Sequence, residues 1–257
     1  VVVASRELAA AGIDEPALQA SYLACRALNA AHGKTYFLAT LLLPPAKRPY
    51  VHALYGFARY ADEIVDDLAS TLTEQEKADW LRSWGEQFFT DLRRGGSDDP
   101  VCKAVVDTVQ RWDIPVEHFE AFLHSMTMDL TVTEYATYDD LYEYVYGSAA
   151  VIGLQMVPIL EPTAPEAYDR AKDLGVAFQL AQPVLVKRAI DQSIASGDLA
   201  GVGTVALLYL GTLVGAFVAI AHGQIDDVTD DDMVAKAHAL DDLAIPYVEA
   251  RNDAPGQ

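Results

Sequence analysis

Helical periodicity runs along nearly the whole sequence, with apolar residues three or four positions apart, whereas alternating strand patterns are scarce. Prolines and capping residues divide this pattern into segments. Thr73 followed by Glu76, for example, is typical of a helix start. The sequence therefore predicts an all-α chain that folds as one domain over residues 1–257, a helical bundle around a central cavity. The helices are expected at residues 17–31, 50–69, 71–91, 101–112, 115–132, 138–160 and 165–196.

The chain carries a formal net charge of −20 over 257 residues. A nucleic-acid-binding protein needs a basic surface to neutralise phosphates, so this charge argues against that class of partner. It also argues against simple electrostatic attraction to anionic lipids. An acidic protein can still bind a diphosphate when divalent cations bridge carboxylates to phosphate. The charge therefore fits either a metal-dependent enzyme that acts on phosphates or an acidic surface without a catalytic role.

The cysteines and the uncharged segments bear on location. Cys25 and Cys102 have neither metal-binding nor redox-motif spacing, and we expect both to be small buried apolar residues. No basic region followed by a long apolar run is visible at the N-terminus, so a cytoplasmic location is expected. Residues 199–225 carry no charge and are long enough to span a bilayer. Their glycines, and the lack of flanking Lys and Arg, favour a buried core helix, with a membrane span as the alternative.

The strongest chemical signal is an aspartate-bearing segment at residues 55–67. Tyr55, Arg59, Asp62 and Asp66 follow an i, i+4, i+7, i+11 pattern and share one face of a helix. Asp62 and Asp66 are one turn apart, a spacing that lets both carboxylates reach a pair of hard cations. Arg59 can grip phosphate oxygens with two hydrogen bonds. The alternative is a solvated acidic face with an intrahelical Arg–Asp pair. The neighbouring stripe is apolar and can pack into a core: Leu54, Ala58, Ala61 and Val65.

Three stretches of sequence occur in a fixed order: 32–67 with HGKTYFLA and ALYGFARYADEIVDD, 128–153 with LYEYVYGSAA, and 174–181 with LGVAFQLA. Together they resemble the squalene/phytoene synthase family, and phytoene synthases in particular, over about residues 21–181. The resemblance implies an isoprenoid synthase fold. It also implies head-to-head condensation of two geranylgeranyl diphosphates to phytoene through a cyclopropyl diphosphate intermediate. The cofactor it implies is Mg²⁺, with Mn²⁺ as an alternative metal.

The resemblance also implies roles for individual residues. Asp62, Glu63 and Asp66 would hold the metal, with Asp67 close by. Arg59 and Tyr144 would join Asp62 and Asp66 as catalytic residues, although Tyr144 has a plain alternative as a core residue. The substrate-binding residues implied are His32, Lys34, Thr35, Arg59, Tyr144, Gly147, Ala149 and Gln179.

Other functions remain open at this point. A squalene synthase-type enzyme would use shorter substrates and a nicotinamide hydride. A non-catalytic relative would bind a prenyl diphosphate without turning it over. The expected partner is a prenyl diphosphate in each case, with no nucleic acid. Peripheral membrane association for product release is left open, and the oligomeric state cannot be read from the sequence.

The sequence departs from the family after residue 181. The family's second signature continues with further aspartates, but the corresponding positions here are Val186 and Ile190. Pro183 is expected to disturb the helix that would present them. Residues 182–257 match nothing in the family. Candidates for replacing the missing acidic cluster are Asp226, Asp227 and Asp230, which also fit an acidic loop or helix start.

Overall fold

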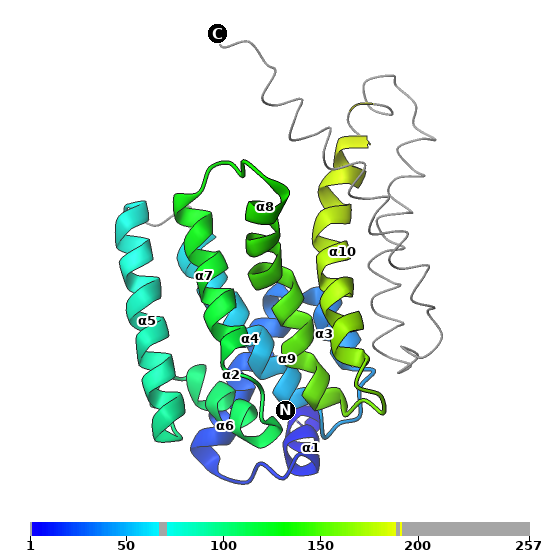
Figure 1. Cartoon of the computed structure of the whole chain (residues 1–257). Coiled ribbons are helices and arrows are strands. Elements are labelled where there is room, and N and C mark those ends of the chain that lie inside the picture. The colour runs from blue at the N-terminus through cyan, green and yellow to red at the C-terminus, as the bar shows by residue number, and fades with distance from the viewer. Residues whose placement is uncertain (1, 67–70, 189–190, 192–257) are drawn as a thin grey trace.

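A computed structural model of the chain describes residues 2–66, 71–188 and 191. Every regular element in these residues is helical, which confirms the predicted all-α class. Figure 1 shows α5, α7, α8 and α10 running alongside one another, with α1 and α6 at the opposite end from the loop that joins α7 to α8. The elements are α1 (Val2–Ala10), α2 (Pro16–His32), α3 (Lys34–Thr40), α4 (Arg48–Asp66), α5 (Glu74–Arg94), α6 (Cys102–Trp112), α7 (Glu117–Thr131), α8 (Tyr138–Val145), the π-helical turn η1 (Tyr146–Ala150), α9 (Val151–Leu160) and α10 (Ala167–Arg188).

The aspartate-bearing helix, α4, is the hub of the bundle, because it packs against α2, α5, α6, α7 and α9. Its predicted apolar stripe is confirmed: Leu54, Ala61 and Val65 are buried, while the opposite face keeps its charged residues. Burying one face of α4 therefore fixes the direction in which its carboxylates point. At the centre of the core, the ring of Phe57 contacts those of Trp84, Phe88, Phe119 and Phe122.

Several local predictions are confirmed in detail. Thr73 caps α5, and the Glu76 carboxylate accepts a hydrogen bond from the Thr73 backbone, forming the expected capping box. Cys25 and Cys102 are both buried and free. Three other predicted features lie outside the described residues: the last turn of the helix expected at 50–69, the end of that expected at 165–196, and the segment 199–225. The acidic candidates Asp226, Asp227 and Asp230 also lie outside them.

One helix prediction is confirmed with an addition, and one needs correction. The helix expected at 138–160 begins and ends as predicted, and it contains a π-helical turn, η1, between α8 and α9. The expectation that Pro183 interrupts the last helix was wrong, since the backbone of α10 is helical from Ala167 through Pro183 to Arg188. A proline removes one hydrogen bond from the helical ladder, and a long helix that packs against two neighbours can retain its path without it. α10 has such support from α9 and η1.

The stretch Tyr138–Leu160 is long and apolar enough to cross a membrane by length and composition alone. In the fold it packs against α7 and α10, and Val151, Leu154 and Ile159 are buried. A central helix of a globular domain meets the same criterion, because its apolar residues face other helices. This stretch is therefore accounted for as a core element of the bundle.

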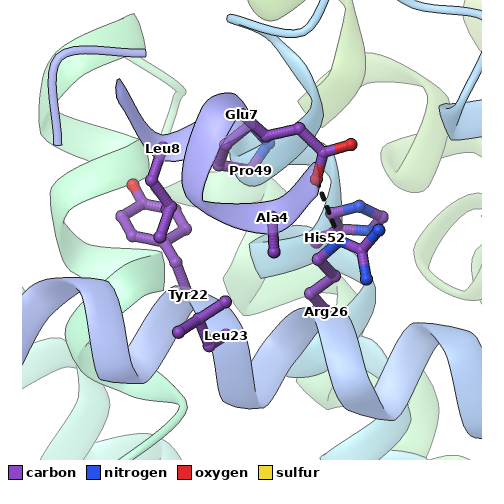
Figure 2. Close-up of a pocket in the computed structure, with 8 residues that line it drawn as sticks. All are labelled: Ala4, Glu7, Leu8, Tyr22, Leu23, Arg26, Pro49 and His52. Atoms are coloured by element: carbon purple, nitrogen blue, oxygen red, sulfur yellow. Dashed lines mark hydrogen bonds and ion pairs between the residues drawn. The ribbon is translucent and has the colours of Figure 1, made fainter. Parts of the chain in front are cut away.

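The N-terminal helix α1 is fastened to the bundle by a buried carboxylate. Figure 2 shows Glu7 facing Arg26 beside a small cavity of about 10 Å³, the space of one water-sized sphere. Glu7 is 2% exposed, and its carboxylate pairs with Arg26 Nε at 2.9 Å and with Arg48 Nη1 at 3.0 Å. Arg48 also donates to two backbone carbonyls of the loop that follows α3. The network therefore joins α1 and α2 to the start of α4.

We expect Glu7→Ala to lower the free energy of unfolding by about 2 kcal/mol, because it leaves two half-buried guanidinium groups without their shared partner. Glu7→Gln retains an acceptor and should cost less. Chemical unfolding monitored by circular dichroism measures both. Glu86→Gln, an exposed glutamate on α5, is the matched control and should stay within about 0.5 kcal/mol of wild type. Equal stability of Glu7→Ala and the control would contradict this role.

Candidate active site

A polar cavity of about 460 Å³ opens at the end of the bundle where α4 and α7 finish and α5 begins. This volume lies in the range of small-molecule sites. Six elements contribute to its walls, so residues far apart in sequence meet there. The lining residues are Asp62, Val65, Asp66, Glu74, Met126, Asp129, Leu130, Tyr144, Ser148 and Gln179.

The predicted carboxylate pair lies on one wall of this cavity. Asp62 and Asp66 project from successive turns of α4, and Asp66, the last residue of the helix, is exposed. Arg59 lies one turn before Asp62, and its Nη1 donates to Asp62 Oδ2 at 2.7 Å. Its Nε donates to Glu63 Oε1 at 3.2 Å. The structure thus brings Arg59, Asp62 and Asp66 together as predicted, and it turns Glu63 toward the guanidinium of Arg59 and away from the cavity lining.

The carboxylates repel one another. Partial burial raises the pKa of Asp62, the neighbouring Asp66 carboxylate raises it further, and the Arg59 guanidinium opposes both effects. Burial also raises the pKa of Asp129, another carboxylate of the cavity lining, with smaller contributions from Asp66 and Asp62. A site that accumulates negative charge in this way is one that a bound cation would relieve.

The cavity lining also includes polar, uncharged groups. Tyr144 of α8 and Gln179 of α10 both line the cavity, as expected from the sequence, and Ser148 of η1 is a third such residue. Burial and the nearby Asp129 carboxylate together raise the pKa of Tyr144, so the phenol stays protonated. The cavity therefore combines carboxylates from α4, α5 and α7 with neutral hydrogen-bonding groups from α8, η1 and α10.

Gly147 and Ala149, which the family resemblance implies as substrate-binding residues, are not among the residues that line this cavity. Gly147 faces α7, where a side chain at this position would overlap the Ser125 hydroxyl and the Ala121 carbonyl oxygen. The carbonyl oxygen of Ala149 faces α10, 2.6 Å from where a Cβ on Gly175 would stand. Neither Gly147 nor Ala149 belongs to the lining of the cavity described above. Both instead permit the close packing of η1 between α7 and α10.

The remaining predicted residues lie at the junction of α2 and α3. His32, Lys34 and Thr35 are exposed there, and none is among the residues that line the cavity. The His32 ring is 3.7 Å from the Glu63 carboxylate, which places it at the edge of the Arg59 network. Gly33 fits closely against the ring of Tyr55, because a Cβ there would stand 2.6 Å from it. This close approach fixes the start of α3 beside the site-bearing face of α4.

The donor set suits a hard cation shared with a phosphate ligand. Within the described ranges, no three His, Cys, Asp or Glu side chains converge closely enough to form a complete metal site by themselves. Mg²⁺ typically takes only one or two carboxylates and fills its octahedron with waters and substrate phosphate oxygens. Asp62 and Asp66 provide such a partial set, in a cavity where their charges are not fully compensated. These residues therefore fit a cation that arrives together with a diphosphate.

Sequence reasoning did not assign a role to Asp129, Glu74 or Ser148, although all three line the cavity. Asp129 lies in the stretch 128–153 that carried the family resemblance, and a carboxylate there was a usable signal. Glu74 opens α5 and was seen only as part of a helix start. Ser148 could not be found from a helical wheel, since the π-helical turn changes the spacing at which side chains share a face.

Comparison with known proteins agrees with this geometry. The model of a family described as squalene/phytoene synthase matches residues 29–183, ending beside the point where the sequence departs from the family pattern. The 15-cis-phytoene synthase of Synechococcus elongatus is 33% identical over 175 residues, which are 63% of this chain and 56% of that protein. Phytoene synthase 1, chloroplastic, of Arabidopsis thaliana is 35% identical over 167 residues, which are 62% of this chain and 38% of that protein. The match thus spans little more than half of the first relative and less of the second.

Two solved structures share the fold. The squalene synthase HpnC from Alicyclobacillus acidocaldarius superposes with a TM-score of 0.62 and 19% identity, covering 93% of this chain and 98% of that one. A dehydrosqualene synthase in complex with a ligand superposes with a TM-score of 0.58 and 22% identity, covering 91% and 86%. At these identities the likeness bears on the fold, and it confirms the predicted isoprenoid synthase fold.

Proposed function

Because this chain belongs to the squalene/phytoene synthase family, we propose that it condenses two geranylgeranyl diphosphates head to head to give phytoene. The observation that carries the proposal is the cavity, whose lining brings the carboxylates of Asp62 and Asp66 together with the neutral groups of Tyr144 and Gln179. An ionising prenyl diphosphate needs both kinds of group. Its diphosphate leaves as an anion, and its prenyl end becomes a cation that must be kept from water.

Asp62 and Asp66 would hold Mg²⁺, with Mn²⁺ as a substitute, and the bound metal would supply charge neutralisation to the departing diphosphate. Glu63 has a different role in this proposal. Its pairing with Arg59 and its proximity to His32 make it a residue that holds the guanidinium in place. Arg59 then exchanges its contact with Asp62 for the oxygens of the incoming phosphate, since guanidinium groups bind such oxygens in pairs.

The reaction of the prenyl chains depends on the neutral groups that line the cavity. Loss of the first diphosphate leaves an allylic cation, which alkylates the double bond of the second substrate, and loss of a proton as the three-membered ring closes gives the cyclopropyl diphosphate. Loss of the second diphosphate, rearrangement and loss of a proton then give phytoene. Tyr144 can stabilise these cations with its ring face and its oxygen, because aromatic rings attract positive charge electrostatically. The exposed Lys34, Thr35 and His32 at the start of α3 would meet the diphosphate as it enters.

A squalene synthase-type reaction is the second candidate, because the family model that matches this chain describes squalene as well as phytoene synthases. Such an enzyme would take shorter substrates and, for squalene itself, a hydride from a nicotinamide. A third possibility is a relative that binds a prenyl diphosphate and does not turn it over, because Val186 and Ile190 stand where the family has acidic residues.

We expect product formation to require a divalent cation and to favour the longer substrate. The experiment incubates the protein with geranylgeranyl or farnesyl diphosphate, with and without NADPH, in Mg²⁺ or in EDTA. Phytoene from the longer substrate, unaffected by NADPH and lost in EDTA, is the expected result. Squalene that appears only with NADPH would contradict the proposal and support the squalene synthase-type reaction. Turnover in EDTA would contradict the proposed requirement for a divalent cation.

A further inference from the structure

Three successive turns of α7 pack with one face against the segment that carries Tyr144. Ala121, Ser125 and Asp129 are spaced four residues apart, so they form a single stripe along the helix. The Ala121 carbonyl and the Ser125 side chain lie where a side chain on Gly147 would have to go. Ser125 Oγ donates to the Tyr144 carbonyl oxygen at 3.0 Å. Asp129 completes the stripe beside the Tyr144 hydroxyl.

This arrangement holds Tyr144 at both ends. Its backbone carbonyl accepts a hydrogen bond from Ser125, the Asp129 carboxylate is near enough to raise the pKa of its phenol, and the ring of Tyr135 lies 5.7 Å from its own ring. A phenol that donates a hydrogen bond to a carboxylate presents its oxygen lone pairs to the other side. Since Tyr144 and Asp129 both line the cavity, that other side is the cavity itself.

Resting on the proposed function, we infer that Asp129 is a positioning residue for Tyr144. Its carboxylate accepts a hydrogen bond from the protonated phenol and so turns the lone pairs of the Tyr144 oxygen toward the place where the prenyl cation forms. Neither the motif analysis nor the carboxylate pattern of α4 assigns this role. Asp129 acts here through Tyr144, which is the group that meets the substrate.

The electrostatics of the cavity favour the same arrangement. Asp129 lines the same cavity as Asp62 and Asp66, and burial together with their negative charges raises its pKa. The carboxylate therefore gains from a nearby hydrogen-bond donor, and we assign that role to Tyr144. In return, burial and the Asp129 charge keep the Tyr144 proton in place by raising the pKa of the phenol.

A fluorine probe tests the contact without requiring activity. The residue at position 144 is replaced by a fluorinated tyrosine through amber suppression in the full chain, and its titration is followed by ¹⁹F NMR. Because the Asp129 charge raises the pKa of the Tyr144 phenol, Asp129→Asn should lower the apparent pKa of the probe. Glu120→Gln, an exposed glutamate two turns earlier on α7, should leave it unchanged. An unchanged probe in Asp129→Asn would overturn the inference.

Kinetics then tests the positioning role. Asp129→Asn should lower kcat about tenfold to a hundredfold with little change in KM, the loss expected for a weakened hydrogen bond to a charged partner. Tyr144→Phe should mask this effect, so that the double variant is no slower than Tyr144→Phe alone. Additive losses would overturn the inference. If wild type forms no product, the proposed function fails, while the fluorine titration still decides the contact between Asp129 and Tyr144.

Discussion

Asp62→Asn is expected to reduce product formation by about a hundredfold to a thousandfold, because Asp62 would hold the cation that stabilises the departing diphosphate. Asp62 is the best placed of the candidate metal-binding residues, because it lines the cavity and also contacts Arg59 at 2.7 Å. Steady-state kinetics with geranylgeranyl diphosphate and Mg²⁺ measures the change. Activity within a few-fold of wild type would contradict the metal-binding role of α4.

The same variant should fold at least as well as wild type in the absence of metal. The pKa of Asp62 is raised in the fold, so its ionised form costs free energy at neutral pH. This cost is absent at acid pH, where the carboxyl is protonated in both states, and it is fully present above the raised pKa. Mg²⁺ with diphosphate should raise the Tm of wild type and not that of Asp62→Asn.

Glu63→Gln, at the next position of α4, is the matched control for Asp62→Asn. Its side chain pairs with Arg59 and does not line the cavity, so its loss should disturb the guanidinium without removing a metal ligand. We expect a smaller fall in activity than for Asp62→Asn, together with a retained Tm response to Mg²⁺ and diphosphate. If Glu63→Gln lost as much activity and as much of the Tm response as Asp62→Asn, Glu63 would belong among the metal ligands.

Gly147→Ala is expected to destabilise the fold by about 3 kcal/mol, a large effect for one added methyl group. The new Cβ would overlap the Ala121 carbonyl oxygen, which belongs to the backbone of α7 and cannot rotate away. Either α7 or η1 must shift, and both carry residues of the cavity wall. Urea unfolding measures the change, and activity should fall with it because Tyr144 moves with η1.

Gly96→Ala is the control for the glycine substitution. A Cβ at Gly96 meets nothing within 4 Å, and its backbone φ is not in the left-handed region. Its free energy of unfolding should stay within about 0.5 kcal/mol of wild type. If Gly147→Ala were as stable as Gly96→Ala, the close packing of η1 against α7 would not exist in solution.

The sequence predicted the aspartate-bearing helix well, for a physical reason. A helix with one buried stripe has a single way to pack, so the burial of Leu54 and Ala61 determines where Asp62 and Asp66 point. The capping box at Thr73 was equally predictable, because it depends only on residues three positions apart. Helical periodicity and local hydrogen bonds both depend on residues that are close together in sequence, so both can be predicted from it.

The other wall of the cavity depends on contacts between distant segments, and there the prediction was incomplete. Gly147 was assigned to substrate binding through the family resemblance, and the close approach of α7 gives it a packing role. The π-helical turn packs against both α7 and α10, which are distant from it in sequence or follow it. A role for Asp129 can be recognised only once α7 is seen to pack beside α8. The spacing of residues along one helix does not predict contacts between two different helices.

The most direct measurement incubates the wild-type chain with geranylgeranyl diphosphate and Mg²⁺, extracts the hydrocarbon and identifies it by mass. Phytoene is the predicted product, and it should be absent with Asp62→Asn. That result would establish that a chain with Val186 and Ile190 in place of the family's second acidic pair still completes an active site. Bound substrate with no hydrocarbon from either protein would contradict the enzyme assignment and leave a protein that only binds prenyl diphosphates.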